Sequence, residues 1–201
     1  MLKPFCTILA GPNGSGKSSI YEKLQPPGKF VNADEIAKAL PADLEGSARQ
    51  VKAGRLAIDR INKLIDAKED FTFETTLSSQ HSLGVMERAK AAGFHVSILF
   101  VALDKPERNV ERVQFRVADG GHDIPTETII RRYEASFRNL SKALQIVDEG
   151  VLIDNSKKFP RWVIKTKAGQ IIEMQRVAGS KLHRRFAEIA EKVLPLSLED
   201  E

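Results

Sequence analysis

The stretch that decides the fold is Gly11-Pro12-Asn13-Gly14-Ser15-Gly16-Lys17-Ser18. It satisfies the pattern G-x-x-x-x-G-K-[ST] in full, between an apolar run, Phe5–Ala10, and a helical pattern from about Lys17 to Leu24. Strand, glycine-rich loop and helix in this order are the context of a phosphate-binding loop, or P-loop. The alternative, a Gly/Ser-rich surface loop that matches by chance, would not need these flanking elements.

The residue types of this loop suit a nucleotide triphosphate. Glycines let the backbone curl so that successive N–H groups point at phosphate oxygens, and the positive end of the following helix adds to that field. Lys17 can reach the β- and γ-phosphates, and the Ser18 hydroxyl can bind Mg²⁺. We therefore predict ATP and Mg²⁺ as cofactors, with Ser18 as the metal ligand. The predicted nucleotide-binding residues are Gly11, Pro12, Asn13, Gly14, Ser15, Gly16, Lys17, Ser18 and Ser19.

Outward from this loop, apolar runs alternate with amphipathic stretches, which is typical of an α/β fold with a parallel sheet. The expected strands are Phe5–Ala10, Phe30–Asn32, Asp70–Glu74, His95–Leu103 and Val151–Asp154, followed by a hairpin of Trp162–Thr166 and Gln170–Gln175. After the first helix, the expected helices begin at Asp34 and then cover Glu45–Lys68, Ser82–Ala92, Lys105–Asp119, Thr126–Glu149 and Ser180–Val193. His95–Leu103 is the most apolar strand, as a strand buried on both faces should be.

Composition limits the class of protein. The chain has 201 residues, 42% of them hydrophobic and 29% charged, which fits one soluble globular domain and does not suggest disorder. The net charge of +4 suits a pocket for several phosphates, so it need not mean nucleic acid. Cys6, the only cysteine, lies in an apolar run and is expected to be buried. No run predicts a signal peptide or a membrane span, so we expect a cytoplasmic protein.

Three classes of protein share the P-loop: switch GTPases, motor or assembly ATPases, and small-molecule kinases. The sequence has no Asn-Lys-x-Asp motif of the kind associated with guanine, because Asn62-Lys63 is followed by Leu64-Ile65. Asp104 ends an apolar strand, but Lys105-Pro106 follows it and no second carboxylate adjoins it to activate water. These observations favour a kinase.

Asp34 is the candidate catalytic base. It follows the second strand, and functional residues of parallel sheets gather at the carboxyl ends of strands. A carboxylate beside the P-loop could accept the proton of an attacking hydroxyl. Asp34 before Glu35-Ile36-Ala37-Lys38 is also a good helix start, and an N-cap is an equally good interpretation. Both roles can hold at once.

The third strand ends in Glu74-Thr75-Thr76-Leu77-Ser78-Ser79. One carboxylate followed by four hydroxyls could form a rim that binds the substrate. The alternative is a capped turn, since Ser and Thr favour such positions.

Arginines cluster in a segment of residues 108–133. Arg108, Arg112 and Arg116 repeat every four residues and share one helix face, and the Gly120-Gly121 pair and Arg131-Arg132 follow. Guanidinium groups suit the charge that spreads over a transferred phosphoryl group, so we favour a lid that closes over ATP. The alternative is a solvated charged face, because Glu107, Glu111 and Glu134 could pair with these arginines.

Taken together, these segments resemble the zeta toxin family of P-loop kinases. The resemblance spans about Thr7 to Ser156. It rests on residues 10–19, Val31-Asn-Ala-Asp-Glu-Ile36, Phe73-Glu-Thr-Thr-Leu-Ser78, residues 116–125, Ile130-Arg-Arg-Tyr133 and Ile153-Asp-Asn155. It implies a parallel five-stranded sheet with helices on both faces, like that of adenylate-type kinases.

The resemblance also implies a reaction and its residues. The family transfers phosphate from ATP, with Mg²⁺, to the 3′-hydroxyl of UDP-N-acetylglucosamine, and a small antitoxin holds the enzyme. Lys17 matches the family's P-loop lysine and Asp34 its base, while Glu74, Thr75 and Thr76 fall on the substrate-side segment. Arg116 matches one phosphate-clamping arginine. The other is Arg131 or Arg132, of which we assign Arg131 to catalysis and Arg132 to substrate.

We therefore expect residues 1–201 to form one P-loop kinase domain, with a lid at about 108–133 and a hairpin and helix at about 160–195. The expected partners are a nucleotide-sugar substrate and an antitoxin, with no membrane and no nucleic acid. Alternative acceptors are a nucleoside, an antibiotic or a polynucleotide 5′-hydroxyl, and a nucleotide-gated binding module is the non-enzymatic alternative. Lys181, His183, Arg184 and Arg185 at the carboxyl end could bind an acidic partner, but we expect them to form an ordinary solvated face.

Overall fold

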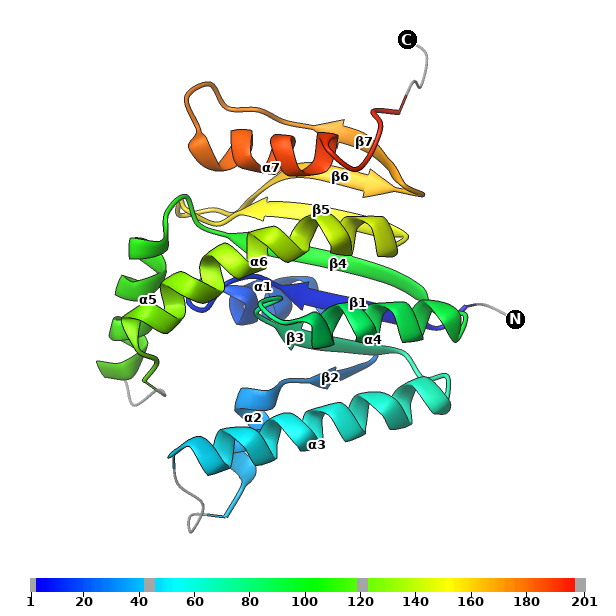
Figure 1. The fold of residues 1–201 in the computed structure, drawn as a ribbon, viewed down its shortest axis with the longest axis vertical. Helices are drawn as coiled ribbons and strands as arrows, with labels where there is room; N and C mark the ends of the chain where they lie inside the picture. Colours follow the sequence, from blue (N-terminus) through cyan, green and yellow to red (C-terminus); the bar gives the residue numbers. More distant parts are fainter. Residues whose placement is uncertain (1–2, 42–45, 119–122, 198–201) are drawn as a thin grey trace.

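The computed structural model describes residues 3–41, 46–118 and 123–197, apart from the side chain of Ser47. Its helices and strands alternate along most of the chain (Figure 1). The strands are β1 Phe5–Ala10, β2 Lys29–Val31, β3 Phe71–Thr75, β4 His95–Ala102, β5 Glu149–Asp154, β6 Arg161–Lys167 and β7 Gln170–Met174. The helices are α1 Lys17–Leu24, α2 Ala33–Ala39, α3 Gly46–Asp66, α4 Gln80–Ala91, α5 Pro106–Ala118, α6 Thr126–Ile146 and α7 Lys181–Glu191.

The strands form one sheet in the order β2-β3-β1-β4-β5-β6-β7. The first five strands in this order are parallel, as predicted, while β6 pairs with β5 and β7 with β6 in antiparallel fashion. The predicted hairpin therefore extends the parallel sheet to seven strands. Since β1 lies between β3 and β4, the carboxyl ends of β3, β1, β4 and β5 meet at the edge where the P-loop begins (Figure 1).

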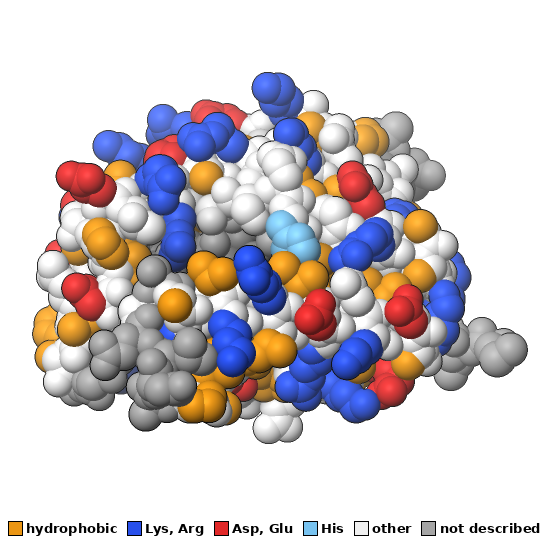
Figure 2. All heavy atoms as spheres, turned by 60° about the horizontal axis from the view of Figure 1, so that its bottom comes forward, with side chains coloured by type: hydrophobic (Ala, Val, Ile, Leu, Met, Phe, Trp, Pro, Cys, Tyr) orange, Lys and Arg blue, Asp and Glu red, His pale blue; other side chains and the backbone are white. Residues whose placement is uncertain are grey.

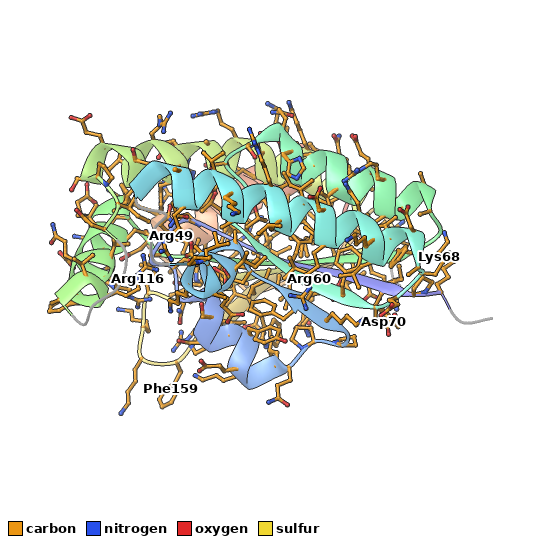
Figure 3. The ribbon with its side chains drawn as sticks, turned by 90° about the horizontal axis from the view of Figure 1, so that it is seen from below. Arg49, Arg60, Lys68, Asp70, Arg116 and Phe159 are labelled. Carbon is orange, nitrogen blue, oxygen red and sulfur yellow. The ribbon has the colours of Figure 1, made fainter. Side chains whose placement is uncertain are left out.

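Helices lie on both faces of the sheet, as predicted, but unequally. Figures 1 and 3 show α3, α4 and α6 on one face and α1 on the other. Alternate β-strand side chains point to opposite faces, so Ile8 of β1 joins the large core under the first set and Leu9 joins a small core with Ile20 of α1. Cys6 is fully buried in the large core, as expected.

The prediction that β4 is buried on both faces holds only for its second half. Val96 and Ile98 are fully buried, whereas His95, Ser97 and Leu99 on the opposite face are partly exposed. Because α1 is only eight residues long, it leaves the first half of that face open.

Several predicted boundaries were wrong by a few residues. The helix predicted to run from Thr126 to Glu149 ends at Ile146, because Val147 is extended and Glu149 already begins β5. The third strand ends at Thr75 and not at Glu74, because Thr75 still pairs with Ala10 of β1. Propensity does not reveal these limits, which depend on the neighbouring strand.

The carboxyl-terminal helix packs against the same core. Phe186 of α7 is fully buried, and its ring lies 6.0 Å from that of Phe100 and 5.9 Å from that of Phe137. One residue predicted to lie on a solvated face does not, and a second is only partly exposed. His183 is buried, and Arg185 donates two hydrogen bonds to the carboxylate of Glu134.

No helix in the described part of the chain is both long and apolar enough to cross a membrane.

Candidate active site

The P-loop joins the end of β1 to the start of α1. Gly11 has a φ of 141°, and a Cβ atom there would lie 2.0 Å from the carbonyl oxygen of Val101, so only glycine fits. Gly14 and Gly16 also have positive φ values, of 73° and 92°. Gly16 is the N-cap of α1 and provides no side-chain cap, so the first N–H groups of the helix are left for an anion.

Lys17 is held inside this loop. Its side chain is 6% exposed, and Nζ donates hydrogen bonds to the carbonyl oxygens of Gly11 at 2.9 Å and Pro12 at 3.2 Å. Glu74 Oε1 lies 3.6 Å from the same Nζ. The lysine therefore has a fixed position and a counter-charge.

Glu74 connects three parts of the site. Its register partner in β1 is Leu9, so the parallel pairing of β3 and β1 brings it to the P-loop. Besides lying near Lys17, it accepts hydrogen bonds at Oε2 from Ser18 Oγ at 3.3 Å and from Asn32 Nδ2 at 3.2 Å. Sequence reasoning placed Glu74 only on the substrate-side rim. In the structure it contacts the phosphate-binding residues.

The pair formed by Ser18 and Glu74 fits a magnesium ion. Mg²⁺ prefers hydroxyl, carboxylate and phosphate oxygens, and in P-loop proteins it is held by the loop's Ser or Thr and a carboxylate from a neighbouring strand. Ser18 was predicted as the metal ligand from its motif. Glu74 could not be recognised as its companion, because only the strand order reveals that β3 is next to β1.

Asp34 lies in the first turn of α2. The N-cap of this helix is Asn32, whose Oδ1 accepts the hydrogen bond of the Asp34 N–H at 2.8 Å. The capping role that the sequence offered to Asp34 thus belongs to Asn32. The Asp34 side chain is exposed, and its carboxylate has no hydrogen bond or ion pair within the described residues. Because Asn32 also binds Glu74, the start of α2 is tied to the P-loop side.

The hydroxyls after β3 are engaged in a turn. Thr75 Oγ1 accepts the N–H of Leu77 at 3.1 Å and lies 2.7 Å from Ser82 Oγ, while Thr76 Oγ1 lies 2.8 Å from Ser78 Oγ. These contacts match the alternative interpretation of the segment as a capped turn. The role of Thr75 and Thr76 in substrate binding stays a prediction.

Helix α5 attaches the predicted lid to the P-loop. Asn109 is fully buried, and its Nδ2 donates to the carbonyl oxygen of Asn13 at 2.6 Å. Arg112 donates to the carbonyl oxygen of Asn155 at 2.9 Å. Burial lowers the pKa of Arg112, repulsion from Arg108 adds to the effect, and Asp104 opposes it.

The remaining arginines separate into two groups. Arg132 of α6 donates to Asn13 Oδ1 at 3.2 Å, so it reaches the P-loop. Arg131 beside it is exposed, and so is Arg116 in the last turn of α5. Arg116 lies at the same end of the molecule as Phe159, away from Lys68 and Asp70 (Figure 3). Residues 119–122 of the predicted lid lie outside the described residues.

Tyr133 fixes the base of this segment. Its hydroxyl donates to the carbonyl oxygen of Leu103 at 2.9 Å, and burial raises its pKa to about 12. It therefore stays protonated and keeps donating at neutral pH.

The corner after β5 is a contact that sequence reasoning missed. Asn155 Nδ2 donates to the carbonyl oxygen of Ser15 in the P-loop at 2.8 Å. Ser15 is fully buried, and its Oγ has no hydrogen-bond partner within the described residues, which fits a loop shaped around a phosphate. In the sequence, Ile153-Asp154-Asn155 is recognisable only as part of the family resemblance. No residue-level signal assigned a partner to Asn155.

Charge on the α3 side of the molecule is mixed. In the described part of the face in Figure 2, Lys and Arg side chains alternate with acidic and hydrophobic ones. This face does not form the continuous basic stripe that a polynucleotide backbone favours.

The sequence model of the zeta toxin family matches residues 2–171 of the chain. The chain belongs to the zeta toxin family. A Haemophilus influenzae protein is 33% identical to it over 124 residues, which cover 61% of this chain and 88% of that relative.

Solved structures share the fold of this zeta toxin family member. One comes from the PezAT toxin-antitoxin system of Streptococcus pneumoniae, with a TM-score of 0.66 and 19% identity over 96% of this chain and 86% of that chain. A chain of the AvrRxo1-ORF1:AvrRxo1-ORF2 complex has a TM-score of 0.71 and 18% identity, covering 98% of this chain and 66% of its own. A chain of the Pnkp1/Rnl/Hen1 RNA repair complex has a TM-score of 0.55 and 21% identity, covering 71% of this chain and 47% of its own. The α/β fold with a mostly parallel sheet is confirmed.

Proposed function

We propose that the protein transfers the γ-phosphate of ATP to the 3′-hydroxyl of UDP-N-acetylglucosamine. One observation carries the proposal: Glu74 contacts both Lys17 and Ser18 of the P-loop. Through Asn32, Glu74 is also linked to the first turn of α2, where the Asp34 side chain is exposed. Membership of a family of P-loop kinases supports the reaction type. The nucleotide sugar as acceptor follows from the family resemblance.

The residues of the P-loop would bind ATP. The N–H groups of residues 11–19 would contact the phosphates, and Lys17 would bring its charge to the β- and γ-phosphates. Ser18 and Glu74 would hold Mg²⁺, which neutralises charge on the phosphates when it is bound. A solved AvrRxo1-ORF1:-ORF2 structure is described as containing ATP, which supports the choice of nucleotide.

Asp34 would act on the acceptor hydroxyl. As the hydroxyl oxygen forms its bond to the γ-phosphorus, its proton passes to the Asp34 carboxylate, and the bond between that phosphorus and the bridging oxygen breaks to leave ADP. This carboxylate is exposed and has no partner among the described residues, so an incoming hydroxyl could reach it. Glu74, Thr75 and Thr76 would contribute to the acceptor's surroundings.

The segment of residues 108–133 would close over the nucleotide. Arg132 is the arginine with a hydrogen bond to the P-loop, so it is the better candidate for a phosphate clamp than Arg131. Arg116 would be the second clamp, brought in by closure. Within one P-loop kinase domain, the hairpin and α7 would support the site from the carboxyl end.

A small antitoxin would be the protein partner. The PezAT system of Streptococcus pneumoniae is a toxin-antitoxin system and resembles this chain over 96% of its length. That likeness supports a partner of the same kind here.

A second acceptor class has one observation in its favour, the fold likeness to a chain of an RNA repair complex. A polynucleotide acceptor would make binding strongly dependent on salt, whereas a nucleotide sugar would not.

The test is to incubate the protein with ATP, Mg²⁺ and a panel of UDP-sugars, nucleosides and a 5′-hydroxyl oligonucleotide, and to analyse the products by mass spectrometry. We expect a gain of one phosphate on UDP-N-acetylglucosamine. Phosphorylation of another member of the panel alone would overturn the proposed acceptor and leave the kinase assignment intact. ADP formation without a phosphorylated acceptor would contradict both.

A further inference from the structure

The corner Asp154-Asn155-Ser156, which follows β5, gathers contacts from several elements. Its link to the P-loop is the hydrogen bond from Asn155 Nδ2 to the carbonyl oxygen of Ser15. Its link to β4 is the hydrogen bond from the Asn155 N–H to the carbonyl oxygen of Ala102 at 2.9 Å. Any group that fixes this corner therefore also acts on the P-loop.

The same corner anchors α5 and the turn before it. Ser156 Oγ accepts the Asp104 N–H at 2.8 Å, and its carbonyl oxygen accepts a hydrogen bond from Arg108 at 2.7 Å. Arg112, one turn further along α5, binds the carbonyl oxygen of Asn155. The start of the proposed lid thus rests on Asn155 and Ser156, and Asn155 also holds the P-loop.

Asp154 gives the corner its shape. One carboxylate oxygen, Oδ1, accepts the Ser156 N–H at 2.8 Å and closes a tight turn. The other, Oδ2, lies 2.9 Å from Nε2 of His183 on α7. The side chains of His183 and Asp154 are only 4% and 12% exposed, so water competes little for this contact.

The tautomer of His183 follows from its two partners. Its Nδ1 lies 3.1 Å from the backbone nitrogen of Val177, which can only donate. Nδ1 must therefore be the acceptor, and the proton of the neutral ring is on Nε2, where it is donated to Asp154. Both ring nitrogens are used, and the ring joins the loop before α7 to the end of β5.

We propose that His183 is a positioning residue for the nucleotide site. By fixing Asp154, it holds the corner in the form that binds the Ser15 carbonyl and the arginines of α5. The inference rests on the proposed function only in taking the P-loop's ligand to be ATP. It assigns a role to α7, which lies beyond the residues matched by the family, 2–171.

Two conservative variants separate the two hydrogen bonds of this ring. In His183→Gln, the amide nitrogen reaches about as far as Nε2 and can still donate to Asp154. In His183→Asn, the amide oxygen stands near Nδ1 and can still accept from Val177, but no donor reaches Asp154. Both variants keep a polar side chain and one native contact, so they are matched in their cost to the fold.

The first measurement is hydrogen exchange in the nucleotide-free protein. We expect His183→Asn to speed exchange of the amides of Asp104, Asn155 and Ser156 about tenfold, and His183→Gln to leave them near wild type. The amide of Ala92, which donates to the carbonyl oxygen of Arg88 at the end of α4, serves as the remote control and should not change. The proposal would be overturned if His183→Asn sped exchange throughout the chain, or if it left exchange of the corner amides at the wild-type rate.

The second measurement is the dissociation constant for ATP with Mg²⁺, by calorimetry. We expect His183→Asn to weaken binding about 3- to 30-fold and His183→Gln to stay within about threefold of wild type. In an Asn155→Ala background, His183→Asn should add little, because the link to Ser15 is already lost. Equal effects of the two variants, or full additivity with Asn155→Ala, would contradict the inference. A wild-type protein that binds no ATP would refute the proposed function instead, and the exchange experiment would still decide the role of His183.

Discussion

The phosphate side and the acceptor side of the site differ in how many contacts they make before any ligand binds. On the phosphate side, Lys17 is buried and bonded to two carbonyl oxygens, and Glu74 joins it to Ser18 and Asn32. On the acceptor side, the Asp34 carboxylate is exposed and has no partner within the described residues. The residues proposed to bind phosphate are thus already joined to one another in the fold, whereas the proposed acceptor would have to supply contacts of its own.

This difference has a physical reason. Groups that stabilise charge in a transition state work best when they are already oriented, because no reorganisation is then needed during the reaction. A base that must fit a variable acceptor has to stay accessible. Substitutions on the phosphate side should therefore slow phosphoryl transfer to every acceptor by the same factor. Substitutions on the acceptor side should slow transfer to some acceptors more than to others.

Among substitutions on the phosphate side, the largest expected effect comes from the arginines of α6. Arg132→Ala should lower kcat about 10³-fold, as loss of a phosphate-clamping arginine does, whereas Arg131→Ala should change it less than about threefold. Steady-state kinetics with ATP and UDP-N-acetylglucosamine would measure both. A greater loss in Arg131→Ala would reverse the assignment of the two residues.

A smaller effect is expected at Glu74. Glu74→Gln should raise the Mg²⁺ concentration needed for half-maximal activity about 10- to 100-fold, because the amide is a poorer partner for the ion and for Ser18. Glu173→Gln on β7, which removes the ion pair with Lys165, is a matched control. The same magnesium dependence in both variants would remove Glu74 from the metal site.

The smallest effect concerns a residue outside the site. Burial alone would raise the pKa of Asp148, but hydrogen bonds from the Val96 N–H and Lys90 lower it below its ordinary value of 3.8. The folded state thus favours the ionised form of Asp148. The stability that this carboxylate contributes to the folded state is fully present above about pH 4 and is lost as the pH falls further. Asp148→Asn should lower the free energy of unfolding by about 1 kcal/mol at pH 7.

Urea unfolding at pH 7 and at pH 3 would test this sign. The difference in the free energy of unfolding between wild type and Asp148→Asn should be smaller at pH 3 than at pH 7. The ATP affinity of the variant at pH 7 should equal that of wild type. A gap that widens on acidification would contradict the assignment.

Sequence predicted the elements that have strong local signals. The P-loop pattern, the alternation of apolar and amphipathic segments and the closely spaced strand patterns Trp162–Thr166 and Gln170–Gln175 predicted five parallel strands and a hairpin, as observed. A period of two or 3.6 residues and the residue types at turns are visible in a single chain.

What could not be predicted depends on contacts between distant segments. Nothing local to Glu74 shows that β3 lies next to β1, and nothing local to Asn155 shows that it reaches Ser15. The N-cap was ambiguous for the same reason, since Asn32 and Asp34 are both good capping residues and only the backbone geometry decides between them. His183 stands in a run of charged residues, but it shares a helix face with Phe186, Ala187 and Ala190, and this spacing is a local signal for its burial. Its partner Asp154 has no such signal.

The proposed role of Asp34 predicts that Asp34→Asn separates phosphoryl transfer from ATP binding. With ATP, Mg²⁺ and UDP-N-acetylglucosamine, we expect no phosphorylated sugar nucleotide by mass spectrometry, while the dissociation constant for ATP stays within about twofold of wild type, because the carboxylate has no contact with the P-loop. A variant that phosphorylates the sugar at the wild-type rate would show that position 34 is not the base. A variant that loses ATP binding would show that the carboxylate belongs to the phosphate side after all.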